Sequence, residues 1–251
     1  MTGSLVVVGL GPGDSGLIPP ETLAALEYAT DVVGYAPYLA RLPASAAQQL
    51  HPSDNRAEMA RAHHALEMTM AGRHVAVVSS GDPGVFAMGA AVMEALENSP
   101  PAWRDMEIRI LPGITAMLAA AAAVGAPLGH DFCAINLSDN LKPWEVIETR
   151  LKLALEADFA MALYNPRSKA RPEGFAKALA LLQAAAGDRR PMIFARNVSL
   201  PTQTITIVPL DQARPHMADM RTIVLLGSSQ TRVISRKGGA LLYTPRSLKR
   251  A

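Results

Sequence analysis

The 251-residue sequence is poor in cysteine and in aromatic side chains. Its single cysteine, Cys133, cannot form a disulfide within the chain, and one thiol cannot by itself hold an iron–sulfur cluster or a cysteine-ligated metal ion. We therefore expect no metal centre and a protein of the reducing cytoplasm. Because 49% of the residues are hydrophobic but only 5% are aromatic, the core must be built mainly from aliphatic side chains.

The sequence also lacks a long apolar run and a strong net charge. Glycine and proline end the apolar stretch Leu5–Leu10, and no basic segment precedes it, so it does not resemble a signal peptide. The apolar stretch Met117–Val124 is far too short to cross a bilayer. A net charge of +2 argues against a general nucleic-acid-binding protein. We expect neither a membrane nor a nucleic acid as a partner.

Basic residues gather near the end of the sequence, where no acidic residue follows Asp219. Two interpretations remain open: a solvated basic segment, or a surface that binds a small polyanion. The basic residues after Met220 are Arg221, Arg232, Arg236, Lys237, Arg246, Lys249 and Arg250.

Strand and helix patterns alternate in the first half of the chain. Buried strands are predicted at Ser4–Gly9, Asp31–Gly34, Val75–Val78 and Glu107–Leu111, and helices at Pro20–Ala29, Asn55–Ala71 and Val85–Glu97. This order predicts a mostly parallel sheet covered by helices. Pro112-Gly113 is the expected boundary, which gives an N-terminal domain over 1–112 and a C-terminal domain over 113–251.

The second half of the chain predicts a different sheet. Strands are expected at Phe132–Leu137, Phe159–Tyr164, Met192–Ala195, Thr204–Val208 and Thr222–Leu226, and helices at Thr115–Val124, Pro143–Glu156 and Pro172–Ala186. The later strands follow one another with no room for a helix, which favours antiparallel pairing. The predicted fold class is therefore α/β, with two α/β domains, a mostly parallel sheet in the first and a mixed sheet in the second.

Three glycine-containing segments follow predicted strands. In the first, Gly9–Asp14, the dinucleotide-binding fingerprint would need glycine in place of Asp14, and the lysine of a P-loop is missing. In the second, Ser80–Val85, glycine lets a ligand approach the backbone, and Asp82 supplies a carboxylate. The third, Leu111–Ala116, leads into an alanine-rich helix whose first N–H groups lack helical partners.

Each segment also has a purely structural interpretation. The first is a tight turn, and Asp82 and Thr115 are candidate helix N-caps. Polar residues follow two further strands, in Leu163–Ser168 and Ala195–Gln203, where the charge of Arg196 needs a partner. Taken singly, none of these segments decides the function.

In order and spacing, the segments resemble the tetrapyrrole (corrin/porphyrin) methyltransferase family. That family shows a Gly-x-Gly-Pro-Gly-Asp turn, a Gly-Asp-Pro loop and a Pro-Gly-x-Ser/Thr-Ala motif. The three stand here at residues 9–14, 81–83 and 112–116, and the resemblance runs from about Leu5 to Leu226. Further segments are similar to the subgroup that methylates C17 of precorrin-3B and contracts the ring in cobalamin biosynthesis, namely Leu163–Ser168, Ala195–Asn197 and Gly227–Arg232.

The resemblance implies the class III S-adenosylmethionine methyltransferase fold, with two α/β domains on either side of a trough. It implies S-adenosylmethionine as the methyl donor, a tetrapyrrole such as precorrin-3B as the substrate, and a homodimer. The implied donor contacts are Pro12, Gly81, Asp82, Val85, Thr115, Ala116, Asn165, Val198 and Thr222.

The implied chemistry depends mainly on positioning. The donor sulfonium is already an electrophile, so the enzyme holds its methyl group in line with a nucleophilic ring carbon. Because corrin precursors carry many carboxylates, three arginines are the candidate substrate ligands: Arg167, Arg196 and Arg232.

Ring contraction also requires that a hydroxyl group lose its proton. Asp14 is the candidate base, and Asn197 or Ser229 would orient the reacting groups. A second interpretation of Asp14 is equally good, namely that its carboxylate only stabilises the turn.

Other functions remain open. Within the same fold family, the substrate could be uroporphyrinogen, diphthine or cobalt-factor III. A non-enzymatic RNA-binding protein is a further alternative, since some relatives methylate ribosomal RNA, but the weak basicity and the lack of aromatic clusters disfavour it. A nicotinamide-dependent reductase shares the glycine-rich first turn. Thermal stabilisation by S-adenosylhomocysteine but not by NADPH separates these classes.

Overall fold

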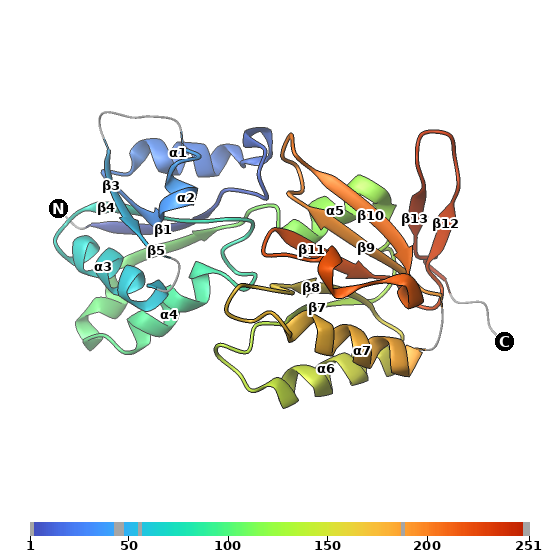
Figure 1. Cartoon of the computed structure of the whole chain (residues 1–251). Coiled ribbons are helices and arrows are strands. Elements are labelled where there is room, and N and C mark those ends of the chain that lie inside the picture. Colours follow the sequence, from blue (N-terminus) through green and yellow to red (C-terminus); the bar gives the residue numbers. More distant parts are fainter. Residues whose placement is uncertain (1–2, 43–47, 55–56, 187–188, 248–251) are drawn as a thin grey trace. The chain divides into compact units, whose positions relative to one another are not determined.

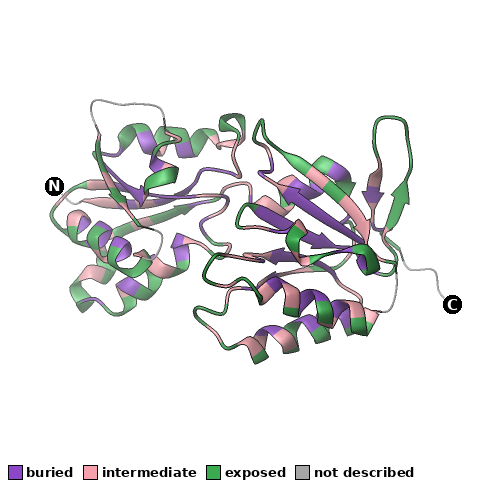
Figure 2. Cartoon of the chain, in the orientation of Figure 1, coloured by how far each residue is buried: buried purple, intermediate pink, exposed green. Residues whose placement is uncertain are grey.

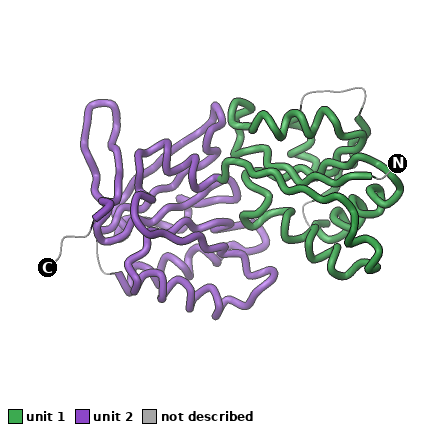
Figure 3. Tube along the Cα trace, turned by 180° about the vertical axis from the view of Figure 1, so that it is seen from behind, with its two compact units in different colours: residues 1–115 green, residues 116–251 purple. Residues whose placement is uncertain are grey.

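The structure is a computed structural model that describes residues 3–42, 48–54, 57–186 and 189–247. The chain divides into two compact units, Met1–Thr115 and Ala116–Ala251 (Figure 3). This division falls within the Leu111–Ala116 segment, beside the boundary expected at Pro112-Gly113. Among the described residues, no helix is long and apolar enough to cross a membrane.

Unit 1 is built on a parallel five-stranded sheet with the order β3-β2-β4-β1-β5 (Figure 1). Because its described strands all run in one direction, their carboxyl ends lie at the same edge of the sheet. The strands are β1 (Ser4–Gly9), β2 (Asp31–Tyr35), β3 (Gln49–Ser53), β4 (His74–Ser79) and β5 (Glu107–Leu111). The helices are α1 (Pro20–Tyr28), α2 (Ala36–Leu39), α3 (Glu58–Met70) and α4 (Met88–Glu97), with 3-10 turns at Ser15–Leu17 and Pro101–Asp105.

Helices cover both faces of this sheet. Val7 of β1 and Val77 of β4 pack with α3 and α4, whereas their chain neighbours Val8 and Val78 pack with α1 and α2. A strand that is buried on both faces needs apolar residues at successive positions, which explains the continuous apolar runs of β1 and β4. Figure 2 shows these strands buried and the outer faces of the helices exposed.

Unit 2 is built on a mixed five-stranded sheet with the order β10-β9-β11-β8-β7. Only the pair β7 and β8 is parallel among these neighbours. Helix α5 packs on one face, and α6 and α7 pack on the other. The strands are β7 (Phe132–Asn136), β8 (Ala160–Tyr164), β9 (Pro191–Arg196), β10 (Thr204–Pro209) and β11 (Thr222–Leu226), and the helices are α5 (Ala116–Val124), α6 (Trp144–Glu156) and α7 (Gly174–Ala186).

A small third sheet completes unit 2. It joins β12 (Arg232–Ile234) to β13 (Leu241–Tyr243) and to the short β6 (Gly125–Ala126). The basic residues Arg232, Arg236 and Lys237 are exposed on this hairpin. Two 3-10 turns, Leu210–Gln212 and Pro215–Met217, connect β10 to β11.

The predicted fold class is confirmed, including the antiparallel pairing of β9 with β10. Five helices and strands of the described residues were not predicted: α2, β3, β6 and the two strands of the hairpin, β12 and β13. Strand β3 carries Pro52 and polar residues and lies at the sheet edge, where a missing N–H costs little. Helix α4 begins at Met88 and not at Val85, because Phe86 has a left-handed backbone with φ +53°.

Candidate functional site

The three glycine segments meet at the carboxyl edge of the unit 1 sheet, because they follow the adjacent strands β4, β1 and β5. Gly11 and Gly81 exchange two backbone hydrogen bonds, with N···O distances of 3.2 and 2.9 Å. A Cβ atom added to Gly113 would lie 2.2 Å from the carbonyl oxygen of Gly81, and one added to Gly9 would lie 2.5 Å from the same oxygen. Only glycine at these positions lets the three backbones pack together.

Asp82 ties the second segment to the third. Its Oδ1 accepts the backbone N–H of Gly84 at 2.8 Å, and its Oδ2 accepts that of Gly113 at 2.9 Å. The N-cap of α4 is instead Ala87, which makes no side-chain capping bond. The N-cap interpretation of Asp82 is therefore wrong, and its carboxylate fixes the loops that were predicted to bind the donor.

The other predicted residues of unit 1 lie around this point. Pro12 and Val85 are half-buried, and the backbone N–H of Val85 donates to the Asp82 carbonyl at 3.2 Å. Thr115 is buried directly before α5. Asp14 is exposed, and its Oδ1 accepts the Gly16 N–H at 2.8 Å, capping the 3-10 turn. The turn-stabilising role of Asp14 is thus present in the structure.

One edge of the unit 2 sheet gathers a second group of predicted residues. Strands β8 and β9 both run antiparallel to β11, so their carboxyl ends lie beside the start of β11. Asn165, Asn197 and Thr222 therefore share this edge. Both asparagines have left-handed backbones, with φ of 51° and 50°, a region that asparagine adopts more readily than most residues.

Hydrogen bonds hold the side chains at this edge. The Asn165 amide donates to Asn136 Oδ1 at 3.1 Å, and the Asn197 amide donates to Thr202 Oγ1 at 3.1 Å. Asn197 and the neighbouring Val198 are buried. These contacts fix the loops after β8 and β9.

The start of α5 lies at the same edge. The Met117 backbone N–H, one of the N–H groups that lack a helical partner, donates to the Tyr164 hydroxyl at 3.1 Å. Tyr164 ends β8, next to Asn165, and Ala116 is half-buried at the first position of α5. The residues of unit 2 that the sequence predicts as donor contacts thus lie together at one edge of the sheet.

Arg196, whose charge was expected to need a partner, forms an ion pair with Asp219 within unit 2. Its Nε donates to Asp219 Oδ2 at 2.7 Å, and the two side chains are 40% and 45% exposed. Burial raises the pKa of Asp219, but hydrogen bonds from Arg196, Thr222 and the Arg221 backbone outweigh that effect and hold the pKa below its usual value. Arg167 is half-buried in the loop after β8, at the same sheet edge.

Ser229 and Arg232 lie away from this edge. Ser229 follows the other end of β11, where its Oγ donates to Asp158 Oδ2 at 2.6 Å. A five-residue strand spans roughly 16 Å, so Ser229 and Asn197 stand at opposite ends of the sheet. Of the two residues predicted as alternatives to orient the reacting groups, Asn197 therefore lies at the edge with Asn165 and Thr222, and Ser229 lies at the far end of the same sheet. Arg232 is exposed on β12, in a different sheet.

Two arginines that the sequence analysis missed hold the loops. Arg41 donates to carbonyl oxygens of the first glycine segment, at distances from 3.0 to 3.3 Å. Arg171 donates to the carbonyl oxygens of Leu137 and Asn165 at 3.4 and 3.5 Å. No local pattern marks either arginine, because each bonds to atoms more than 25 residues away in the sequence, in Leu10, Gly11 and Gly13 for Arg41 and in Leu137 for Arg171.

The described residues contain no group of three or more histidine, cysteine, aspartate or glutamate side chains that could hold a metal ion. Cys133 is half-buried in β7, and burial raises the pKa of its thiol.

Comparison with known proteins decides the family. The family model described as Tetrapyrrole (Corrin/Porphyrin) Methylases matches residues 4–214. The chain belongs to this family. The expected family and class of enzyme, a methyltransferase, are thereby confirmed.

Three similar proteins are informative about this methyltransferase. A precorrin-3B C(17)-methyltransferase of Sinorhizobium sp is 53% identical over 247 residues, covering 98% of this chain and 97% of that protein. The crystal structure of the methyltransferase CobJ is 58% identical, with a TM-score of 0.93, and covers 97% of this chain and 100% of that one. A uroporphyrin-III C-methyltransferase from Thermus thermophilus, complexed with S-adenosylhomocysteine, is 20% identical with a TM-score of 0.64, covers 89% of this chain and 92% of that one, and shares the fold.

Proposed function

We propose that this methyltransferase transfers a methyl group from S-adenosylmethionine to C17 of precorrin-3B, with ring contraction, in cobalamin biosynthesis. The observation that carries the proposal is the 53% identity to a precorrin-3B C(17)-methyltransferase over nearly the whole of both chains. In the transfer, the bond between the donor sulfur and the methyl carbon breaks as the new carbon–carbon bond forms, and S-adenosylhomocysteine leaves.

The glycine segments of unit 1 support the donor part of the proposal. Gly81 and Asp82 lie where three backbones meet, and the contacts among Gly11, Gly81 and Gly113 fix these loops before any ligand arrives. A preorganised backbone loses little conformational entropy on binding. The residues proposed to contact the donor are Pro12, Gly81, Asp82, Val85, Thr115, Ala116, Asn165, Val198 and Thr222.

The substrate part depends on arginines at the unit 2 edge. Arg196 and Arg167 lie at the edge that holds Asn165 and Asn197, and a guanidinium recognises a carboxylate through paired hydrogen bonds. Asp219 orients Arg196 through its Nε, at 2.7 Å. We place Arg167 and Arg196 against the acidic groups of the tetrapyrrole. We keep Asp14 as the candidate base for the hydroxyl proton and Asn197 as the candidate that orients the reacting groups.

The decisive experiment supplies metal-free precorrin-3B and S-adenosylmethionine to the purified protein. The expected product is ring-contracted and carries one additional methyl group, which mass spectrometry and the absorption spectrum detect. Cobalt-factor III serves as the competing substrate. Exclusive turnover of the cobalt-containing compound would reject the proposed substrate but retain the methyltransferase.

We also propose that the protein is a cytoplasmic homodimer without a metal centre. The family resemblance supports the dimer, and the single cysteine supports a reducing compartment and the absence of an iron–sulfur cluster. Sedimentation at micromolar concentration should give about twice the chain mass of 26.6 kDa. A monomer at that concentration, or stoichiometric iron in elemental analysis, would count against this assembly or composition.

A further inference from the structure

Arg41 is connected to two of the three glycine segments, although it belongs to neither. It lies just after α2, and its Nη2 donates to the carbonyl oxygens of Leu10, Gly11 and Gly13 at 3.0, 3.3 and 3.3 Å. Its Nη1 donates to Ser80 Oγ at 3.5 Å, in the second segment. One guanidinium therefore spans the first and second glycine segments.

The first segment depends on this cation for its shape. Three carbonyl oxygens turn toward the same nitrogen, and their dipoles repel one another unless a positive donor lies between them. Leu10 and Gly11 are buried, so a lost donor there is not simply replaced by bulk water. Gly11 and Gly13 also leave the unrestrained chain more freedom than other residues would.

The Tyr38 hydroxyl forms a hydrogen bond with the side chain of Ser80, which Arg41 also contacts. Burial raises the pKa of Tyr38, so the phenol stays neutral. Burial also lowers the pKa of Arg41, but a guanidinium remains charged at neutral pH. The positive charge therefore remains available to the carbonyl oxygens.

The proposed donor contacts stand beside the bonds that Arg41 stabilises. Pro12 lies between Gly11 and Gly13, whose carbonyl oxygens Arg41 binds, and Asp82 follows Gly81, the backbone partner of Gly11. A shift of the first segment would therefore move the donor contacts in both segments.

We propose that Arg41 is a positioning residue that holds the first two glycine segments in the geometry that binds the methyl donor. The inference rests on the proposed donor site. It assigns to Arg41 no contact with the reacting atoms, so its loss should raise the KM for S-adenosylmethionine while kcat at saturating donor changes little.

The test compares Arg41→Met, Arg41→Lys and the control Arg109→Met, with S-adenosylhomocysteine affinity measured by calorimetry. Arg109 is the matched control, since it is an exposed arginine on β5 of the same sheet and its carboxylate partner, Glu21, is also exposed. Arg41→Met should weaken binding about tenfold or more, since bonds from a charged donor are lost. Arg41→Lys should lose less, because its amine still donates to the first segment but does not span to Ser80.

Backbone hydrogen exchange gives a readout independent of ligand. The Gly81 N–H, which donates to Gly11 at 2.9 Å, should exchange faster in Arg41→Met than in Arg109→Met. If Arg41→Met does not fold, weaker binding by Arg41→Lys with normal binding by Arg109→Met still supports the inference. Wild-type affinity in the Arg41 variants, or an equal loss in Arg109→Met, would overturn it. Failure of the wild type to bind S-adenosylhomocysteine would instead overturn the donor site itself.

Discussion

The carboxylate of Asp82 accepts the backbone N–H of Gly113 at 2.9 Å, which joins two segments 31 residues apart in the sequence. Its other oxygen holds Gly84 at 2.8 Å. Asp82 thus has a structural task, fixing two loops, that precedes any contact with a ligand.

Asp82→Asn should weaken S-adenosylhomocysteine binding. An amide offers only one acceptor oxygen, so its NH₂ group would face the N–H of either Gly84 or Gly113. The loss of one bond and the clash of two donors should cost about 1–3 kcal/mol, and hence about 5- to 150-fold in affinity. Calorimetry tests this, with exposed Asp105→Asn as the control. Unchanged affinity in Asp82→Asn would show that the tie does not shape the site.

Gly113→Ala should destabilise unit 1 and impair donor binding. The added Cβ would lie 2.2 Å from the Gly81 carbonyl oxygen, so the backbones must separate. Overpacking of this kind typically costs about 1–3 kcal/mol. Gly238→Ala is the matched control, since nothing lies within 4 Å of its added Cβ. Urea unfolding and calorimetry measure the two effects, and equal behaviour of the two variants would contradict the packing argument.

Arg196→Ala and Asp219→Asn should both raise the KM for the tetrapyrrole, and Arg196→Ala should leave S-adenosylhomocysteine affinity nearly unchanged. Loss of a charge-assisted bond costs roughly 1.5–3 kcal/mol, so Arg196→Ala should reduce kcat/KM about tenfold or more. Because Asp219 acts through Arg196, the double variant should be little worse than Arg196→Ala. Arg232→Ala, on the separate sheet, provides the comparison. An equal loss in donor binding would show that Arg196 serves the donor.

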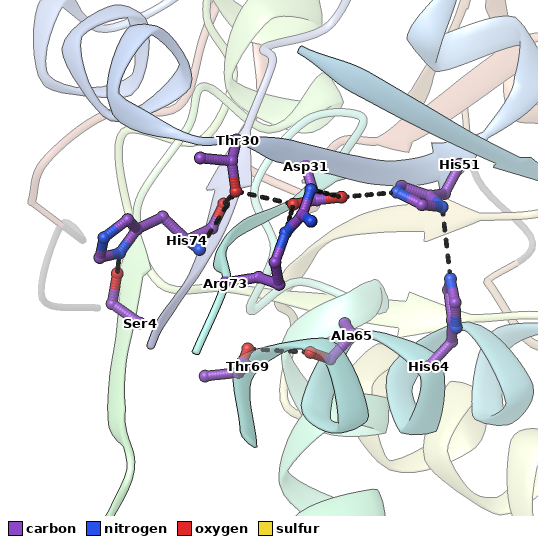
Figure 4. Close-up of polar contacts among 9 residues, drawn as sticks. All are labelled: Ser4, Thr30, Asp31, His51, His64, Ala65, Thr69, Arg73 and His74. Atoms are coloured by element: carbon purple, nitrogen blue, oxygen red, sulfur yellow. Dashed lines mark hydrogen bonds and ion pairs between the residues drawn. The ribbon is translucent and has the colours of Figure 1, made fainter. Parts of the chain in front are cut away.

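Asp31 should make stability depend on acid pH. Its carboxylate, 2% exposed at the start of β2, accepts bonds from Arg73 at 2.7 and 3.0 Å and from His51 at 2.9 Å (Figure 4). Burial raises its pKa, but the bonds from Thr30, His51 and Arg73 outweigh this and lower the pKa below 3.8. The stabilisation is therefore complete above that value and is lost as the pH falls through the lowered pKa.

Asp31→Asn should consequently lower the free energy of unfolding at pH 7 by about 1.5–3 kcal/mol, since hydrogen bonds to a charged carboxylate are lost while Arg73, 48% exposed, stays hydrated. The difference from the wild type should shrink as the pH falls below the ordinary value of 3.8, because the wild-type carboxyl is then also neutralised. Urea unfolding at pH 7 and near pH 3 measures it. A difference independent of pH would assign the effect to packing alone.

The sequence determined most of the helices and strands of the two large sheets and their order. Successive apolar residues in Ser4–Gly9 require a strand buried on both faces, and the alternation in Thr204–Pro209 fits a strand with one exposed face. The glycine motifs likewise indicated the family, because their order and spacing can be read directly from the sequence.

Only the tertiary structure decided what those motifs contact. That Asp82 holds Gly113, that Arg41 spans two loops and that Arg196 pairs with Asp219 depends on strand order and on loop geometry, which no local pattern encodes. The same holds for Ser229. Its motif stands near Thr222 in the sequence, but β11 runs away from the Asn197 edge and carries Ser229 to the far end of the sheet.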